Sequence, residues 1–411
     1  MASRRALCLA ARSPAIAGAH FRAEERPYHP DLDPGGYLNL GTAENRLLWD
    51  LLEPRLTTPR RLTAADIRYG LLYGTASARE AVAAFLTRTR GLPVAPDDLV
   101  IVSGATAALD IAATALCDPG EAIIIPSPYY GAFDVDLAGR SDARLVAAPG
   151  QRGDQFRPCA QALDRAVDRA RRASLNPKAI ALASPSNPVG HVYGPDLLRE
   201  ILQVAAARGL DVIADEVYGN SVFGPDLFTP LSALTGQVLP PDRVHTVWGF
   251  AKDFGLPGLK VGVLHTTDPA VRAAARELAY FAPVSTDTQA MLCSLLAGQA
   301  WTDAFLAAAR ARLGDSYARI AGLLDKYRIG YLPAAAGFSV WIDLGRWLPE
   351  PGFGGETALW HRLWDEARVN ILPGTEFHCP EPGWFRVCHA TEPATVTEAV
   401  GRLARLLEEA S

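Results

Sequence analysis

The sequence lacks the features that mark secreted, membrane-embedded and zinc-binding proteins. Its six cysteines include no Cys-x-x-Cys pair, so we expect buried free thiols in a reducing cytoplasm rather than a disulfide framework. The apolar run Ala6–Ala11 is too short for a signal peptide, and no run approaches the roughly 18 apolar residues that a membrane span needs. Neither His378-Cys379 nor Cys388-His389 has the spacing of a zinc site, so we predict no metal.

An excess of charge of either sign is also missing. The 411 residues include 40 basic and 45 acidic side chains, for a formal net charge of -5, which favours neither a nucleic-acid partner nor a charged membrane surface. There is no internal repeat and no low-complexity tract. An apolar fraction of 49% and a charged fraction of 21% are typical of a globular protein with a large core, and the length permits two or three domains.

The middle of the chain alternates between short apolar runs and longer segments with helical periodicity. This alternation predicts an α/β fold with a mostly parallel sheet that is covered on both faces. Such sheets bind ligands at the carboxyl ends of their strands. We expect seven strands, at Leu99–Val102, Ala122–Ile125, Arg144–Ala147, Ala179–Ala183, Asp211–Ala214, Val244–Trp248 and Val261–His265. We expect helices between them at Ala105–Leu116, Ala160–Ala173 and Pro195–Arg208.

The segments on either side predict a second, smaller α+β domain. Residues 269–327 have a helical pattern. After them we expect a strand, a loop, a helix, a second strand and a closing helix, at Gly337–Leu344, Gly345–Glu356, Thr357–Ala367, Trp384–Cys388 and Glu392–Glu409. Near the N-terminus we expect a frayed or lightly packed tail and two helices, at Met1–Ser13, Arg46–Leu56 and Gly74–Arg90. We therefore predict a large domain over residues 51–290 and a small domain made of residues 1–50 and 291–411.

A lysine between two expected buried strands is the first candidate for chemistry. Lys252 lies among glycines and small residues in the segment Val247–Gly262. A lysine that is desolvated between buried strands has a lowered pKa and can act as a Schiff-base nucleophile. Because most lysines are exposed, a solvated lysine without a chemical role is the alternative.

Further polar groups stand at strand ends or inside apolar strands. Ser103–Thr106 joins a strand to a helix N-terminus, which suits a phosphate but also fits an ordinary turn. The tyrosines of Pro126–Tyr130 can stack on a planar ring or fill the core, and Ser184–Gly190 has the composition of a tight turn. Asp215 needs a cation or water at its strand end. Arg386 lies in an apolar strand, where a bidentate carboxylate partner is the natural reason for a buried arginine.

In this order, these segments resemble one family of enzymes from about Tyr28 to the C-terminus. The sequence resembles the fold-type I enzymes of the class I and II aminotransferase superfamily, which depend on pyridoxal 5'-phosphate (PLP). Within it, the sequence is most similar to 1-aminocyclopropane-1-carboxylate (ACC) synthases. The motifs that carry the resemblance are Leu40–Asn45, Pro126–Tyr130, Asp215–Tyr218, Lys252–Gly258 and Pro382–Cys388. The resemblance implies the fold-type I architecture and a homodimer whose active sites take residues from both subunits.

The resemblance assigns four residues to the reactive part of the cofactor. Lys252 would bind PLP as a Schiff base and, once displaced by substrate, act as the base at Cα. Asp215 would pair with the pyridinium nitrogen and keep it protonated. Tyr218 and Asn187 would donate hydrogen bonds to the ring oxygen O3'. These residues form the expected catalytic centre.

The resemblance also assigns residues to the ring face, the cofactor phosphate and the substrate. Tyr130 would stack on the ring, with Tyr129 as the alternative. The phosphate would meet the helix N-terminus at Ala105 and Thr106.

Substrate binding is assigned to both ends of the amino acid. Arg386, with Asn187 beside it, would bind the α-carboxylate and fix the Cα bond that breaks. Glu44 matches a glutamate that in ACC synthases lies near the sulfonium of S-adenosyl-L-methionine (SAM). A carboxylate at that place favours a cationic substrate over uncharged amino acids.

Two residues depart from the superfamily pattern at the phosphate. Gly249 stands where a serine is usual, and Lys260 stands where an arginine is usual. Glycine donates no hydroxyl, and lysine replaces a bidentate fork with a point charge. We therefore expect the phosphate to be held more loosely, or another group to fill the gap. Tyr73 is the nearest match for the tyrosine that the neighbouring subunit usually supplies, although its spacing to Gly74 differs from the family's by one residue.

Three functions follow from the resemblance. The first is a PLP-dependent lyase or transferase that deprotonates SAM at Cα and releases methylthioadenosine by γ-elimination or substitution. The product is then ACC, or a vinylglycine-type intermediate is trapped by a second substrate in a biosynthetic pathway. The second is an aminotransferase for an aromatic or other apolar amino acid, which uses the same lysine, aspartate and arginine. The third, a PLP-binding regulatory module, is disfavoured because no basic helix-turn-helix segment fits before residue 28.

Overall fold

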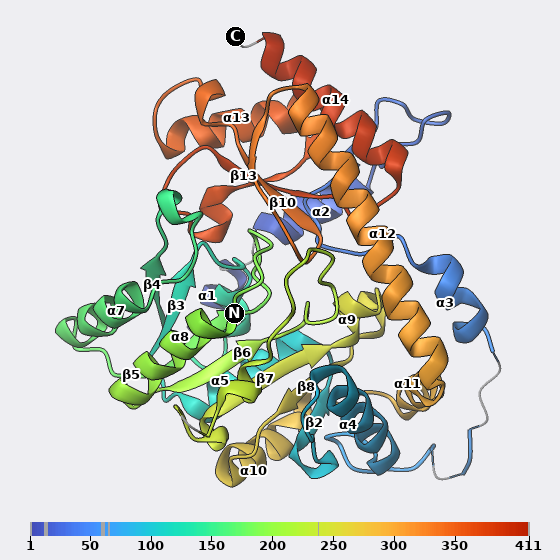
Figure 1. Ribbon diagram of the computed structural model, residues 1–411, viewed down its shortest axis with the longest axis vertical. Helices are drawn as coiled ribbons and strands as arrows, with labels where there is room; N and C mark the ends of the chain where they lie inside the picture. Colours follow the sequence, from blue (N-terminus) through green and yellow to red (C-terminus); the bar gives the residue numbers. More distant parts are fainter. Residues whose placement is uncertain (1, 12–14, 59–61, 65, 237, 410–411) are drawn as a thin grey trace.

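The computed structural model describes residues 2–11, 15–58, 62–64, 66–236 and 238–409. These residues form two stacked parts, each with its own sheet (Figure 1). The larger part carries a seven-stranded sheet and lies at the bottom of Figure 1, and the smaller part carries a four-stranded sheet and lies at the top. The predicted domain boundaries at residues 50 and 290 stay a prediction.

All seven predicted strands are present in the larger sheet. They are β2 (Leu99–Val102), β3 (Ala122–Ser127), β4 (Arg144–Pro149), β5 (Pro177–Ala183), β6 (Asp211–Asp215), β7 (Val244–Gly249) and β8 (Gly262–His265). Their order across the sheet is β2-β8-β7-β6-β5-β3-β4. Only β8 runs antiparallel to its two neighbours, and the other neighbouring pairs are parallel. The prediction of a mostly parallel seven-stranded sheet is confirmed.

Helices bury both faces of this sheet. Along β5, Ala179 and Ala181 face one helical layer, which contains α5 (Ala105–Leu116) and α10 (Pro269–Leu278). The alternate residues Ile180 and Leu182 face the opposite layer, which contains α7 (Ala160–Arg172) and α8 (Pro195–Arg208). Successive side chains of a strand point to opposite faces, so a strand buried on both faces is apolar throughout. The bounds of α5 and α8 are those predicted from the sequence.

A third apolar cluster packs helices around the antiparallel edge of the sheet. It joins α3 (Trp49–Leu56), α4 (Ala76–Arg90), α11 (Thr286–Ala297) and α12 (Gln299–Lys326) to β2, β7 and β8. Helix α12 runs along one side of the molecule from the larger to the smaller part (Figure 1). No single described helix is long and apolar enough to cross a membrane. Only α11 and α12 taken together reach that length and composition, with a bend of 89° between them.

The smaller part is built on the antiparallel sheet β12-β13-β10-β9. Its strands are β9 (Gly330–Leu332), β10 (Ser339–Asp343), β12 (Leu372–Pro373) and β13 (Trp384–Cys388). Helices α13 (Phe353–Asp365) and α14 (Pro393–Glu409) pack on it with part of α12. A separate parallel pair joins β1 (Leu38–Asn39) to β11 (Val369–Asn370). This pair brings the chain from the N-terminal region to the edge of the smaller part.

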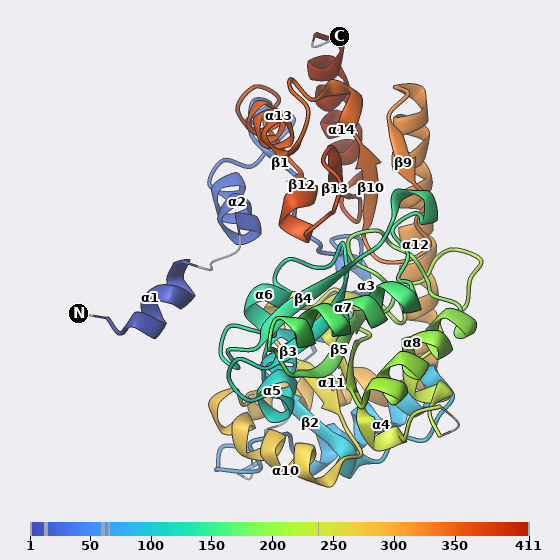
Figure 2. The same ribbon diagram turned by 90° about the vertical axis from the view of Figure 1, so that its left-hand side faces the viewer.

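The N-terminal region contains two helices that the sequence analysis did not predict. Helix α1 (Arg4–Ala11) replaces most of the expected tail and projects from the body of the protein (Figure 2). Helix α2 (Ala15–Glu24) buries Ala19 and Ala23 against Trp364. Alanine favours helix, which fits both elements, and the small side chains of Ala19 and Ala23 let α2 pack against Trp364. Residues 1, 12 and 13 of the predicted tail lie outside the described residues.

The loop expected over Gly345–Glu356 is wrong at both ends. A 3-10 turn begins the segment at Gly345, and α13 starts at Phe353. A Cβ on Gly355 would lie 1.9 Å from the carbonyl oxygen of Glu350, and Gly352 has a φ of +95° just before the helix. These two glycines are therefore required by close packing and a left-handed backbone, which glycine alone tolerates easily. Composition did not distinguish these uses from a flexible loop.

Candidate active site

A cavity of about 240 Å³ lies between the larger and the smaller sheet. It is bounded by residues at the carboxyl ends of β5, β6 and β7, and by Arg386 from β13. This is the place that a parallel sheet offers to ligands. The cavity brings together most of the residues predicted from the sequence, namely Ala105, Thr106, Tyr130, Asn187, Asp215, Tyr218, Lys252, Lys260 and Arg386.

Lys252 presents a buried amine to this cavity. It lies in the short helix α9 (Phe250–Asp253), directly after β7, and its Nζ donates a hydrogen bond of 2.6 Å to the carbonyl oxygen of Ala43. Burial and the nearby charge of Arg386 lower the pKa of Lys252 to about 8. A larger share of this amine is therefore neutral near pH 7 than for a solvated lysine, which makes it a better nucleophile and base.

Asp253 fixes the helix that carries Lys252. Its buried carboxylate accepts hydrogen bonds from Trp248 Nε1 at 2.9 Å, Ser221 Oγ at 2.7 Å and Asn220 Nδ2 at 3.0 Å. These contacts tie α9 to the end of β7 and to the loop that follows β6. Lys252 is therefore positioned by a polar network centred on the buried Asp253 carboxylate.

Asp215 and Tyr218 lie opposite the lysine. Burial raises the pKa of the Asp215 carboxyl to about 7, although the N–H of Val217 and the charge of Lys252 oppose this change. The ring of Tyr218 packs edge-on against Phe338 and lies 5.9 Å from Lys252 Nζ. Burial also raises the pKa of Tyr218, so its hydroxyl remains a hydrogen-bond donor. Asp215 is suited to a cationic ring nitrogen, because a buried carboxylate gains most from a positive partner.

Arg386 is 1% exposed and has an unsatisfied hydrogen-bonding group. One Nη atom donates to Asn187 Oδ1 at 3.0 Å and the other donates to the carbonyl oxygen of Gly41. Its Nε has no hydrogen-bond partner among the described residues. The predicted carboxylate partner of Arg386 is therefore not a protein side chain in the described part of the chain. A buried guanidinium with an unpaired Nε is suited to a ligand carboxylate.

The N-terminus of α5 provides an anion-binding surface at the other end of the cavity. Ser103–Thr106 lines the cavity, and Gly104 precedes the helix with a φ of +95°. The first N–H groups of a helix have no intrahelical acceptor and carry a partial positive charge. Lys260 lines the same end in a left-handed conformation, with a φ of +50°. These groups together suit a phosphate.

Gly249 and Gly262 pack tightly beside this surface. A Cβ on Gly249 would lie 2.8 Å from the carbonyl oxygen of Val261, and a Cβ on Gly262 would lie 2.4 Å from the backbone nitrogen of Ala105. The two glycines face each other in the register of β7 and β8. The packing at this position therefore favours glycine, and a serine in place of Gly249 would displace backbone atoms.

Glu44 does not line the cavity, although Ala43 does. Its Oε2 forms an ion pair of 3.0 Å with Arg46 Nε, and Arg46 forms a second pair of 3.2 Å with Glu24 of α2. This cluster at the cavity edge contains two carboxylates and one guanidinium. Its net charge is therefore negative, and its predicted role toward a sulfonium stays a prediction.

Tyr73 also lies outside the residues that line the cavity. Its ring packs against two guanidinium groups, those of Arg79 at 5.1 Å and Arg276 at 4.6 Å. Its predicted contribution to the phosphate site of a neighbouring subunit stays a prediction.

The two consecutive tyrosines have different environments. Tyr130 lines the cavity. The hydroxyl of Tyr129 instead donates to Asp134 Oδ1 at 2.9 Å, and its ring stacks on His378 at 4.4 Å. The structure therefore favours Tyr130 over Tyr129 as the ring-stacking residue.

Sequence reasoning assigned no role to several residues of the cavity wall, among them Thr42, Ala43 and Asp136. Asp136 is 6% exposed and accepts a hydrogen bond of 3.3 Å from Thr106 Oγ1. The only sequence signal for it is an acidic residue shortly after Tyr130. An acidic side chain is usually exposed, and burial of this one cannot be read from its neighbours in sequence.

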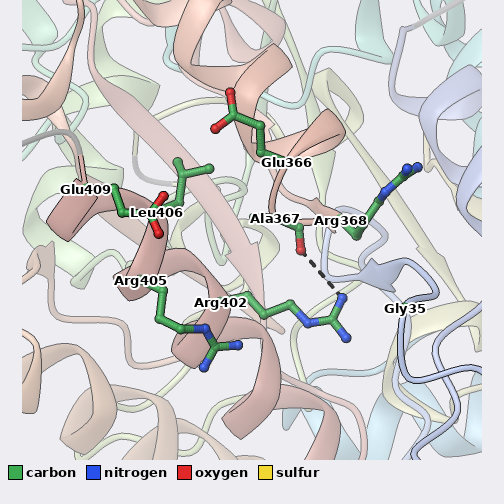
Figure 3. Close-up of a pocket in the computed structure, with 8 residues that line it drawn as sticks. All are labelled: Gly35, Glu366, Ala367, Arg368, Arg402, Arg405, Leu406 and Glu409. Atoms are coloured by element: carbon green, nitrogen blue, oxygen red, sulfur yellow. Dashed lines mark hydrogen bonds between the residues drawn. The ribbon is translucent and has the colours of Figure 1, made fainter.

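A second, larger cavity of about 340 Å³ lies in the smaller part, between α14 and the segment that leads into β11 (Figure 3). Its arginines are already engaged. Arg402 donates to the carbonyl oxygens of Pro34, Gly36 and Ala367, and Arg405 pairs with Glu398. None of the described residues that line it has a buried unpaired group comparable to Arg386 Nε. The cavity of about 240 Å³ between the two sheets is therefore the candidate site.

Comparisons with known proteins agree with this geometry. The sequence pattern of the family described as aminotransferase class I and II matches residues 37–403. The chain is 35% identical over 383 residues to 1-aminocyclopropane-1-carboxylate synthase of Glycine max, covering 89% of this chain and 79% of that protein. It is 34% identical over 395 residues to 1-aminocyclopropane-1-carboxylate synthase 6 of Arabidopsis thaliana, covering 92% and 80%.

Solved structures share the fold. Aspartate aminotransferase from Thermus thermophilus with maleate matches with a TM-score of 0.83 at 22% identity, over 99% of each chain. N-succinyldiaminopimelate aminotransferase from Mycobacterium tuberculosis matches with a TM-score of 0.80 at 24% identity, over 99% of this chain and 100% of that one. At these identities the likeness establishes the architecture alone.

Proposed function

Because this chain belongs to the class I and II aminotransferase family of PLP-dependent enzymes, we propose that it binds PLP and acts on SAM. The observation that carries the proposal is the similarity to ACC synthases over about nine-tenths of the chain, at 35% identity for the Glycine max enzyme. The reaction would remove the Cα proton and release methylthioadenosine from Cγ. The candidate site supports this reaction at each end of the substrate.

The residues around the cavity fit PLP. Lys252 offers the amine for the aldehyde, Asp215 offers a carboxylate for the ring nitrogen, and Tyr130 offers an aromatic face. The N-terminus of α5 and Lys260 offer positive charge for the phosphate. When bound, PLP supplies an electron sink that makes the Cα proton of an attached amino acid acidic.

The protein's own groups would orient the substrate and move its proton. Arg386 Nε and its neighbouring Nη group would bind the α-carboxylate, because Nε is buried without a described partner. Asn187 holds the guanidinium through a 3.0 Å hydrogen bond. Lys252, once free, would take the Cα proton, and its pKa of about 8 suits a base near neutral pH.

The edge of the cavity favours a cationic substrate. Glu24 and Glu44 share the single guanidinium of Arg46, so one negative charge remains near Thr42 and Ala43 of the cavity wall. A sulfonium would be attracted to this charge, whereas an uncharged side chain would gain nothing from it. This is the feature of the chain that supports SAM over the apolar amino acids of an aminotransferase.

A homodimer is part of the proposal. Exposed apolar side chains gather on two adjoining segments, with Ile67 80% and Tyr69 104% exposed on one, and Tyr280 66% and Phe281 70% exposed on the other. The segments adjoin because Thr286 Oγ1 donates to the carbonyl oxygen of Asp66. A surface of this kind fits a second copy of the chain. We expect Ile67→Asp to shift the protein toward a monomer in light scattering.

The direct test is to mix PLP-loaded protein with SAM and identify the products by mass spectrometry. We expect methylthioadenosine, together with ACC if the ring closes or with vinylglycine-derived products if it does not. Lys252→Ala is the control, because it removes the amine and leaves the cavity otherwise intact. If no methylthioadenosine forms and apolar amino acids convert the cofactor to its pyridoxamine form, the protein is an aminotransferase instead.

A further inference from the structure

The phosphate end of the candidate site contains a buried acid that no part of the proposed function uses. Asp136 ends the short helix α6 (Phe133–Asp136) and lines the same cavity as Ala105, Thr106 and Lys260. It is 6% exposed. An acid beside a site for a dianion needs an explanation, because two negative groups in a buried site repel each other.

The hydrogen bonds of Asp136 leave one oxygen available. Thr106 Oγ1 donates to its Oδ2 at 3.3 Å. Among the described residues, no other side chain hydrogen-bonds to the carboxyl and no cation lies within ion-pair distance. Asp136 and Thr106 both line the cavity, and Oδ1 is the oxygen that remains available to a ligand there.

The charges around Asp136 favour its neutral form. Asp215 at the end of β6 and Asp110 on α5 repel a negative charge there, whereas the hydrogen bond from Thr106 and the charge of Lys260, before β8, favour it. Tyr130 also faces it and stays neutral, because burial raises the pKa of Tyr130. Burial, with these neighbours, raises the pKa of Asp136 to about 7 even without a phosphate. A dianionic phosphate would raise this pKa further.

The same end of the site has no side-chain hydroxyl at position 249. Gly249 provides no hydroxyl, and a Cβ at this position would lie 2.8 Å from the carbonyl oxygen of Val261. A further side-chain donor at this end would therefore come from another element, and Asp136 stands on the cavity wall beside Thr106.

We propose that Asp136 is a neutral carboxylic acid when the cofactor is bound and donates a hydrogen bond to the phosphate, in place of the hydroxyl that Gly249 lacks. This inference rests on the proposed function, since it requires PLP in the cavity. The acid takes its proton from solvent when the phosphate enters, so that one proton is bound with the ligand at a pH where the empty site is ionised.

The test measures binding of pyridoxine 5'-phosphate, which has no aldehyde and so forms no bond with Lys252. Its dissociation constant is measured by protein fluorescence between about pH 6 and pH 9 for the wild type, Asp136→Asn and Asp136→Ala. Asp136→Ser serves as a second donor variant in case the amide does not fold. The matched control is Asp134→Asn, which removes a carboxyl from the same helix but not from the cavity wall.

We expect the wild-type dissociation constant to rise, relative to that of Asp136→Asn, by about tenfold per pH unit above about pH 7. Asp136→Asn keeps a donor without a titrating proton, so its affinity at high pH should exceed that of the wild type. Asp136→Ala should bind more weakly than Asp136→Asn at every pH, and Asp134→Asn should follow the wild type. Calorimetry in two buffers should show proton uptake at pH 8 that Asp136→Asn lacks.

Equal pH profiles for the wild type and Asp136→Asn would overturn the inference, as would equal affinities for Asp136→Asn and Asp136→Ala. Failure of cofactor binding, the part of the proposed function on which this inference rests, has a different signature. In that case, pyridoxine 5'-phosphate would not bind the wild type at any pH.

Discussion

Replacing Gly249 by serine tests how the phosphate end of the site is built. The family resemblance implies a serine here, so sequence alone would suggest that this change restores a phosphate contact. The structure predicts the opposite. A Cβ at this position would lie 2.8 Å from the carbonyl oxygen of Val261 and 3.3 Å from Cα of Gly262. Both atoms are backbone, so β7 and β8 must separate locally.

The cost of this change follows from the packing of the two strands. Adding atoms to a tightly packed site costs roughly 1–3 kcal/mol, and here the relaxation moves an antiparallel pair that also borders α5. Gly249→Ala separates the steric effect from the hydroxyl. Gly262→Ala should cost more, because its Cβ would lie 2.2 Å from the carbonyl carbon of Gly104. Gly258→Ala is the matched control, because nothing lies within 4 Å of its Cβ position.

The assay is urea unfolding of the four variants, together with PLP affinity for Gly249→Ser. We expect the free energy of unfolding to fall in the order Gly258→Ala, Gly249→Ala, Gly262→Ala, and Gly249→Ser to bind PLP more weakly than the wild type. A Gly249→Ser protein that is as stable as the wild type and binds PLP more tightly would refute the reasoning.

Three further predictions concern Arg386 at the substrate site, the amine of Lys252, and a buried ion pair in the core. Arg386→Lys replaces the bidentate guanidinium with a single ammonium group, so kcat/KM for SAM should fall by about 10- to 100-fold with little change in PLP affinity. An unchanged kcat/KM would show that Arg386 does not bind the substrate. Neutral Lys252 is the reactive form, and its pKa is lowered to about 8. The rate of PLP attachment should therefore rise about tenfold per pH unit up to this pKa and then level off. Stopped-flow absorbance measures this rate, and a rate that does not change with pH below pH 8 would contradict the prediction. Arg90 pairs with the fully buried Glu216 at 3.0 Å, so Arg90→Ala should cost about 3–5 kcal/mol in urea unfolding, whereas breaking the exposed pair Arg362–Glu366 should cost less than about 1 kcal/mol.

The fold was predictable where burial acts on a whole strand or helix. Ile123–Ile125 and its counterparts are apolar on both faces, so each strand of the larger sheet was evident from local sequence. The helix Ala105–Leu116 was equally evident. The start of α13 was not, because Gly352 and Gly355 serve a positive φ and a close backbone contact that composition does not reveal.

The candidate site was predictable where a motif fixes the backbone and not where long-range contacts decide. Lys252 and Arg386 follow from their motifs and meet at one cavity. The pairing of Glu44 with Arg46 and Glu24 depends on α2, a helix that the sequence analysis did not predict. Asp136 was missed because the sequence does not show which of two nearby acids turns inward. The site roles, the domain boundaries and the cytoplasmic location stay predictions.

The most direct test of the account is whether the holoenzyme removes the Cα proton of SAM at this cavity. SAM is incubated with PLP-loaded wild type and with Lys252→Ala in deuterium oxide, and loss of the Cα proton signal and release of methylthioadenosine are followed together by NMR. The account predicts that both changes develop with the wild type and that both are absent with Lys252→Ala. A wild type that releases no methylthioadenosine and keeps the Cα proton signal, or a Lys252→Ala variant that shows both changes, would contradict it.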